Sequence, residues 1–218
     1  MLSAGAAGPA WLCLLVALTS SVARGGDNLV ANPGFEEAGE KELPAQWEPF
    51  VIGVPARFAL DLSEKHSGQR SIRITAAESA RSYMRSRPIP VVAGEAIRFS
   101  AWVKHEGVPS GKGTVIAIAE FTNAQDLGPE VAKLGVADTS KPGAEWRKIE
   151  GRVQAPEAAA FVRLRLGFSY AQGTCWWDDV VLGVEKTLVA RVDLPGQRLS
   201  PAAGAVPIVI LNRNRQQG

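Results

Sequence analysis

The stretch Gly173-Thr-Cys-Trp-Trp-Asp-Asp-Val-Val-Leu182 decides the fold. It joins a glycine turn to strand-forming residues that carry two adjacent carboxylates. Because successive side chains of a strand point to opposite faces, Trp176 and Trp177 should lie on opposite sides of a sheet. Asp178 and Asp179 then interrupt the apolar pattern. A carboxylate beside a half-buried strand is costly unless a cation or a hydrogen-bond donor meets it, so the stretch predicts such a partner.

The composition indicates one soluble globular domain. The chain has 218 residues, of which 46% are hydrophobic and 21% charged. This length suits one domain of about 150 residues with additional segments. The formal net charge is +2 and the basic residues are scattered, so the sequence lacks the basic stripe that nucleic-acid binding requires.

The first residues, 1–23, read as a secretory signal. The apolar run Trp11–Leu18 is too short to span a bilayer, and Ser21–Ala23 offers small residues for cleavage. The segment before the run has no Lys or Arg, so an uncleaved membrane anchor is the alternative. We therefore expect a secreted protein, or one of the periplasm or cell envelope.

Cysteine usage predicts a domain without disulfides. The sequence has two cysteines, and only Cys175 remains once residues 1–23 are removed. Its place in a predicted strand indicates a small buried hydrophobic residue and not a nucleophile. Such a domain must be stabilised by its core or by a metal.

Two segments alternate with the period of a strand that has one buried face. In the first, the predicted inward residues are Ile97, Phe99, Ala101 and Val103, and the outward ones are Arg98, Ser100, Trp102 and Lys104. In the second, the predicted inward residues are Val162, Leu164, Leu166 and Phe168, and the outward ones are Arg163 and Arg165.

The whole pattern predicts an all-β fold. About nine short strands are separated by Gly, Pro and Asn turns, and no segment reads as an amphipathic helix, which is typical of a two-sheet antiparallel β-sandwich or jelly roll. Within it, we expect an edge-like strand from Leu29, a hairpin connection over Gly107–Gly113, and a less regular excursion over Thr122–Asp138. Residues 186–218 are predicted to be a linker, an extra edge strand or the start of a further domain.

Four segments occur in an order that resembles a known family. They are Asn28–Glu36, His66–Ile74, the Trp102 strand that follows Ala93-Gly94, and Gly173–Val180. Together they resemble the galactose-binding-like jelly rolls among carbohydrate-binding modules, especially the group attached to xylan and β-glucan hydrolases. The resemblance covers residues 27–185.

The resemblance implies a structural calcium ion between the N-terminal segment and the last strand. The side chains of Glu36 and Asp179, and the backbone carbonyls of Gly34, Ser63 and His66, would supply its ligands. Calcium takes about six to eight oxygen ligands in flexible geometry. The alternative is that Glu36 and Asp179 cap turns or pair with Arg and Lys.

The resemblance also implies a ligand face on the outside of one sheet, where aromatic side chains stack on sugar rings and polar groups bond the hydroxyls. The predicted ligand residues are Trp102, Trp176, Arg163, Arg165, Glu120, Tyr83 and Arg85. Arg163 and Arg165 could instead only form salt bridges with Glu120 or other acids. We expect Trp47, Trp146 and Trp177 to be core or packing residues. Both histidines, His66 and His105, are expected in loops.

The predicted function is non-catalytic binding of a polysaccharide or oligosaccharide by an exported module. The sequence has no HExxH motif, no GxSxG motif and no phosphate loop. A glycosidase pair, Glu120 with Glu150 or Asp178, is a minor alternative. The main alternative is a structural or protein-interaction domain that keeps the fold without a sugar site. A companion catalytic domain or an envelope protein is the expected partner.

Overall fold

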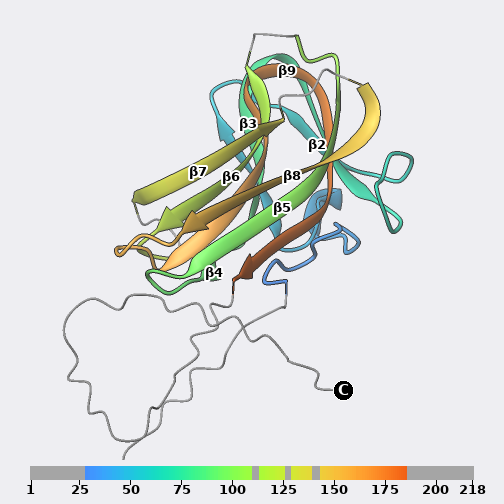
Figure 1. Ribbon diagram of the computed structural model, residues 1–218. Helices are drawn as coiled ribbons and strands as arrows, with labels where there is room; N and C mark the ends of the chain where they lie inside the picture. Colours follow the sequence, from blue (N-terminus) through green and yellow to red (C-terminus); the bar gives the residue numbers. More distant parts are fainter. Residues whose placement is uncertain (1–27, 110–112, 126–128, 139–142, 186–218) are drawn as a thin grey trace, which may run out of the picture.

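The computed structural model describes residues 28–109, 113–125, 129–138 and 143–185. These residues form one 3-10 turn and nine strands, which confirms the predicted all-β class. Figure 1 labels the strands, whose bounds are β1 Trp47–Ile52, β2 Arg57–Asp61, β3 Ser71–Ser86, β4 Ile89–Pro90, β5 Ala96–Glu106, β6 Thr114–Thr122, β7 Glu130–Asp138, β8 Gly143–Gln154 and β9 Phe161–Val184. The 3-10 turn is Glu40–Glu42. The predicted signal, residues 1–23, and the predicted linker, 186–218, lie outside the described residues.

The strands pack as two antiparallel layers. The first, which we call the β5 sheet, contains β2, the first half of β3, the second half of β9, β5 and β8. The second, which we call the β6 sheet, contains β1, the second half of β3, the first half of β9, β6 and β7, with β4 beside the start of β9. This arrangement confirms the predicted β-sandwich.

Two long strands belong to both sheets. β3 has 16 residues and β9 has 24, and in Figure 1 the orange-to-red β9 bends as it passes between the layers. Their pairing register shifts between Ala76 and Ala80, opposite Gly173 and Ala171. Gly173 has a φ of +114°, and a Cβ there would lie 2.6 Å from the carbonyl oxygen of Glu106. Only glycine fits this conformation and this close approach, so Gly173 allows the bend.

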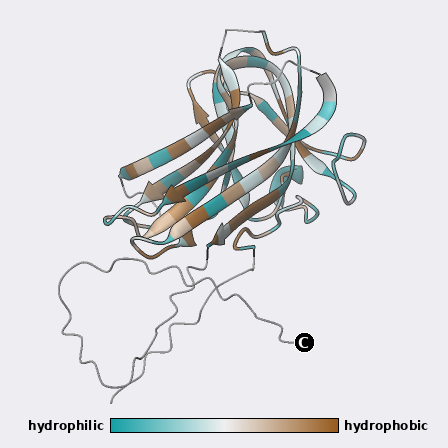
Figure 2. Ribbon diagram, viewed as in Figure 1, coloured by the Kyte–Doolittle hydropathy of each residue, from teal (hydrophilic) through white to brown (hydrophobic). Residues whose placement is uncertain are grey.

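The core lies between the sheets and is formed by the residues that alternation placed inward. Val162, Leu164, Leu166 and Phe168 are fully buried, and Ile97, Phe99, Ala101 and Val103 are at most 1% exposed. The hydropathy bands of Figure 2 follow this alternation along the strands. Cys175 and Trp177 are also fully buried, and burial raises the pKa of the Cys175 thiol, as expected for an inert packing residue.

Several sequence predictions were wrong in detail. The two strands predicted on either side of Gly173 are one strand, because the chain bends there and continues from one sheet into the other. The predicted irregular excursion 122–138 contains the strand β7. The segment that begins at Leu29 is irregular and not a strand, although the Leu29 amide donates a hydrogen bond to the Leu182 carbonyl. β5 and β6 pair with β9 in different sheets, so these two strands do not form the predicted hairpin.

His105 lies within β5, where a loop was predicted. Its Nε2 is 3.2 Å from Asp138 Oδ2, and both side chains are nearly buried, at 4% and 6% exposed. This contact has ion-pair distance without hydrogen-bond geometry. Burial lowers the pKa of His105 more than the nearby Asp138 carboxylate raises it, so His105 is neutral at neutral pH.

Candidate functional site

The predicted ligand residues divide between the two sheets. Five of them lie on the outer face of the β6 sheet, where Tyr83 and Arg85 on β3 are opposite Gly167 and Arg165 on β9, and Glu120 on β6 is opposite Arg163. Arg81 shares this face, two residues before Tyr83. We call this surface, defined by Arg81, Arg85, Arg163 and Arg165, the arginine face.

The centre of the arginine face is a buried ion pair. Arg165 Nε donates to Glu120 Oε2 at 2.8 Å, and a second nitrogen of the same guanidinium contacts Oε1. Arg165 and Glu120 are 8% and 5% exposed. Burial lowers the pKa of Arg165 to about 10, and the positive charges of Arg85 and Arg81 act in the same direction. The predicted salt bridge with Glu120 is therefore present, and it is bidentate and desolvated.

Glu48 on β1 joins two further arginines of this face. Arg85 donates to Glu48 Oε1 through Nε and Nη2, at 3.1 and 2.6 Å, and Arg163 Nη1 lies 3.5 Å from the same oxygen. Arg163 also donates to the backbone carbonyl of Gln125, so the chain after β6 lies over it. These bonds hold the guanidinium planes in fixed orientations.

The two aromatic rings at the centre of the arginine face, Phe50 and Tyr83, are covered. The Arg85 and Arg165 guanidinium groups lie 4.5 and 4.3 Å from the centre of the Phe50 ring. Tyr83 is only 2% exposed, with its ring 6.4 Å from that of Phe50. Polar groups therefore form most of the centre of this face. Sequence analysis missed Glu48 and Phe50, although the alternation of β1 could have placed both beside Tyr83 and Arg85.

Trp102 and Trp176 lie on the outer face of the other sheet. They share that face as predicted, but the segment after β2 covers it. His66 stacks on Trp102 with ring centres 3.7 Å apart, and Trp176, which is 7% exposed, donates to Asp61 Oδ2 at 2.9 Å. Lys104 Nζ lies 5.3 Å from the Trp176 ring. The two tryptophans are thus separated from the five other predicted ligand residues.

The remaining tryptophans match their predicted packing roles in two of three cases. Trp47 and Trp177 are buried, at 6% and 0% exposed. Trp146 is half-buried, with its ring edge against His66 at 5.9 Å between centres. The minor glycosidase alternative has no facing pair, because Glu150 and Asp178 are on the β5 sheet and Glu120 is on the β6 sheet.

The two carboxylates of the deciding stretch meet hydrogen-bond donors from the turn at 66–70. Asp178 is fully buried, and its Oδ2 accepts from the amides of His66 and Ser67 at 2.9 and 3.0 Å. Asp179 accepts from His66 Nδ1 at 2.6 Å and from Ser67 Oγ at 2.7 Å. Burial raises the pKa of Asp178, which the amide bonds only partly offset.

Glu36 completes what we call the carboxylate junction, the group Glu36, Asp178 and Asp179. Glu36 Oε1 accepts from the amides of Gln69 and Arg70 at 2.8 and 3.3 Å. A Cβ on Gly34 would lie 3.7 Å from Asp178 Oδ1 and 3.9 Å from Asp179 Oδ1. Within the described ranges, none of the three carboxylates pairs with Lys or Arg.

Of the five residues predicted to bind calcium, Gly34, Glu36, His66 and Asp179 lie in or beside the carboxylate junction. Ser63 makes its contacts with Asp61, whose Oδ1 accepts from the Ser63 amide and hydroxyl at 2.9 and 2.7 Å. Burial would raise the pKa of Asp61, but the bonds from Ser63, Trp176 and Glu64 hold it well below its usual range. In the part of the chain that the structure describes, no three His, Cys, Asp or Glu side chains converge to hold a metal alone. A calcium ion here would need backbone carbonyls as well, as in the set that the resemblance implies.

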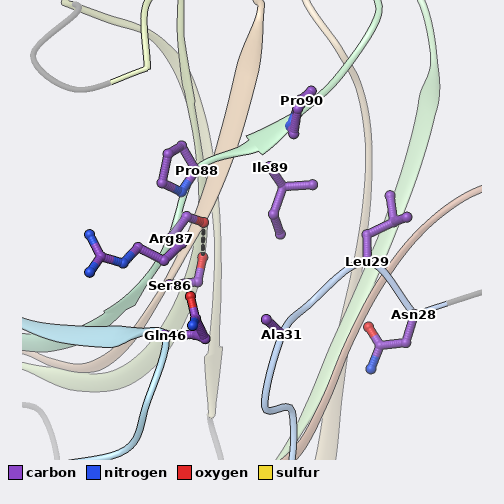
Figure 3. Close-up of a pocket in the computed structure, with 9 residues that line it drawn as sticks. All are labelled: Asn28, Leu29, Ala31, Gln46, Ser86, Arg87, Pro88, Ile89 and Pro90. Carbon is purple, nitrogen blue, oxygen red and sulfur yellow. Dashed lines mark hydrogen bonds between the residues drawn. The ribbon is translucent and has the colours of Figure 1, made fainter. Parts of the chain in front are cut away.

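A separate cavity lies at one end of the sandwich. It has a volume of about 440 Å³ and lies between Asn28–Leu29 and the segment Ser86–Pro90. Figure 3 shows Arg87 with its guanidinium away from Ile89 and Leu29, and the bond from Ser86 Oγ to the Arg87 carbonyl. The cavity contains none of the predicted ligand or calcium residues. Among the described residues, no helix is long and apolar enough to cross a membrane.

The comparisons with known proteins identify the fold. No protein-family model and no curated protein matches the sequence. Among solved structures, the CBM22-1 xylan-binding domain of Paenibacillus barcinonensis Xyn10C has a TM-score of 0.50 at 18% identity, over 76% of this chain and 99% of that one. The arabinose-bound α-L-arabinofuranosidase MgGH51 has a TM-score of 0.54 at 16% identity, over 72% of this chain. The enzymatically active domain of bacteriophage CBA120 tailspike protein 4 has a TM-score of 0.53 at 18% identity, also over 72%.

The three matches differ in the share of the matched chain that they cover. This chain covers only 26% of the arabinofuranosidase and 21% of the tailspike domain, whereas it covers nearly all of the xylan-binding domain. At these identities the likeness concerns the fold. The chain has the antiparallel jelly-roll fold that carbohydrate-binding modules also have.

Proposed function

We propose that this chain is a non-catalytic module that binds carbohydrate on the arginine face. The observation that supports this most is the planar, hydrogen-bonded set of Arg85, Arg163, Arg165, Glu48 and Glu120 on the outside of one sheet. Sugar hydroxyls both donate and accept hydrogen bonds, and charged side chains held in place bond them strongly without losing further side-chain entropy. The match to an entire xylan-binding domain, and only to parts of enzymes, supports a binding role over a catalytic one.

The arginine face also differs from an aromatic sugar platform. Because guanidinium groups cover Phe50, a sugar ring would meet polar groups first, with the edge of Phe50 as the main apolar contact. We therefore propose modest affinity with recognition of hydroxyl positions. Trp102 and Trp176, on the other sheet, take no part in this site.

We further propose that calcium binds at the carboxylate junction and that the protein is exported. Glu36 and Asp179 would supply carboxylate oxygens, and Gly34, His66 and Ser63 carbonyl oxygens. The lack of a Lys or Arg partner for the three carboxylates among the described residues supports this, since a bound cation would offset their repulsion. The proposal of export, to the medium, periplasm or cell envelope, rests on the signal-like residues 1–23.

Isothermal titration calorimetry of residues 27–185 tests the sugar site. Xylo-, β-gluco- and manno-oligosaccharides should include at least one that binds, and Phe50→Ala or Glu48→Gln should weaken it. Trp102→Ala is the matched control on the other sheet and should leave binding unchanged. If Trp102→Ala abolishes binding and Phe50→Ala does not, the sugar binds on the outer face of the β5 sheet and not on the arginine face. If a folded sample gives no heat with any sugar, the protein-interaction alternative replaces this proposal.

A further inference from the structure

We propose that the ligand is an acidic glycan, in which the carboxylate of a uronic-acid residue pairs with Arg81 while its ring packs on Tyr170. This inference rests on the proposed sugar-binding function and specifies its ligand class. It places the acidic group at the end of the arginine face nearest the bend of β9.

Among the described residues, the four arginines of the arginine face have three acids within 4 Å, namely Glu48, Glu120 and Glu130. Arg165 pairs with Glu120, while Arg85 and Arg163 share Glu48. Glu130, on the edge strand β7, lies farther from Arg165, at 3.9 Å. Counted over these described residues, one positive charge remains on the arginine face, and it favours an anionic ligand.

Arg81 is the arginine without an acidic partner. It is directly opposite Ser169, and within the described ranges no carboxylate lies within ion-pair distance of its guanidinium. Its Nε is buried and makes no hydrogen bond there. Because Nε is buried, a ligand would meet the outer nitrogens of this half-buried guanidinium, whose charge has no acidic partner among the described residues. The planar fork of arginine fits a carboxylate with two parallel bonds.

Tyr170 supplies the apolar surface next to this charge. Its side chain is 60% exposed, and the Arg81 guanidinium lies 4.9 Å from its ring centre. The residue has a φ of +56°, which is uncommon outside glycine, and it lies in β9 just before the shift of register. Its ring is thus more exposed than Phe50 or Tyr83, and it offers an open surface on which a sugar ring can pack.

Arg81 and Tyr170 together distinguish an acidic sugar from a neutral one. A neutral sugar could pack on Tyr170 but would leave Arg81 without an anion. A uronic acid places a carboxylate next to a pyranose ring, so one residue satisfies both groups. A sulfate ester shares the negative charge without the planar shape, and the experiment below separates the two.

The test compares matched sugars by calorimetry at low salt. Tetragalacturonate is compared with its methyl ester, and xylotetraose bearing one glucuronic acid group with plain xylotetraose. We expect an acidic member to bind about tenfold or more tightly than its neutral counterpart, with a preference that weakens in 0.5 M salt. In Arg81→Gln the acidic affinity should fall to the neutral value. Arg98→Gln, an exposed arginine of the β5 sheet, is the control and should change nothing.

Each outcome gives a decision. Equal binding of the acidic and neutral members overturns this inference and leaves the proposed function intact. Binding of neither, by protein whose circular dichroism shows it folded, overturns this inference, and the proposed function falls with it only if the xylo-, β-gluco- and manno-oligosaccharides also give no heat. An acidic preference that persists in Arg81→Gln overturns the assignment of Arg81. Tighter binding of a sulfated tetrasaccharide than of the uronates overturns the carboxylate as the recognised group.

Discussion

Replacing Glu120 by leucine should be strongly destabilising, because it removes the acid from a desolvated pair. Arg165 would keep its charge with a side chain only 9% exposed. Breaking a buried ion pair by removing one partner costs about 3–5 kcal/mol. Arg165 would retain Glu130 at 3.9 Å and the Phe50 ring at 4.3 Å, which favours the lower end, about 3 kcal/mol. For a domain of this size, that corresponds to a decrease in melting temperature of roughly 6–12 °C.

The measurement is urea unfolding followed by far-UV circular dichroism, with Glu120→Leu, Arg165→Met and the double variant. Both single variants strand a buried charge and should lose about 3 kcal/mol each, whereas the double variant, with two apolar residues, should be within about 1 kcal/mol of the wild type. Glu150→Leu is the matched control, because that side chain is 69% exposed and pairs loosely with Lys148 at 3.6 Å. It should change stability by no more than about 0.5 kcal/mol. A Glu120→Leu variant within 1 kcal/mol of the wild type would refute the reasoning.

Three further predictions concern other parts of the molecule. Because burial lowers the pKa of His105, the unfolded chain binds more protons than the folded chain below about pH 6.5. The melting temperature should therefore fall from pH 7 to pH 5, and it should fall less in His105→Gln. An equal fall in both proteins would contradict this. Chelation of calcium should lower the melting temperature of the wild type and leave Glu36→Gln/Asp179→Asn unaffected, and an unchanged wild-type melt sinks the calcium proposal. Gly173→Ala should lower the free energy of unfolding by about 1–3 kcal/mol, because its Cβ would lie 2.6 Å from the Glu106 carbonyl oxygen. Gly94→Ala, at a residue with positive φ and open space around it, should lower it less. Equal losses would show that the backbone conformation alone matters.

Alternation predicted the inward and outward residues of single strands and not the sheet to which each strand belongs. Trp102 and Arg165 are both outward, as expected, yet they face opposite sides of the sandwich, since a two-layer fold has two outer faces. Long-range pairing decides between those faces, and a single sequence does not encode it in its local period. The cover of His66 over Trp102 depends likewise on a loop whose path has no periodic signal.

The carboxylate junction was predictable by another route. Asp178 and Asp179 required a partner on physical grounds, and the order of the four motifs implied where to find it. The structure brings His66 to Asp179 across 113 positions of sequence, and it brings Glu36 to the amides of Gln69 and Arg70 in the same turn. The contacts of Ser63 were less predictable, because Asp61 accepts hydrogen bonds from both its amide and its hydroxyl.

The sharing of β9 by both sheets has a consequence for biosynthesis. β9 pairs with β3, β4, β5 and β6, so the β6 sheet lacks its central strand until residues 161–171 are made, and the β5 sheet until residue 184 is made. Strands made earlier expose unpaired edges and apolar faces until β9 is made, which favours the binding of chaperones during synthesis. If the protein is exported as proposed, this late completion of the sheets would keep the chain in the unfolded state that passage through a translocation channel requires.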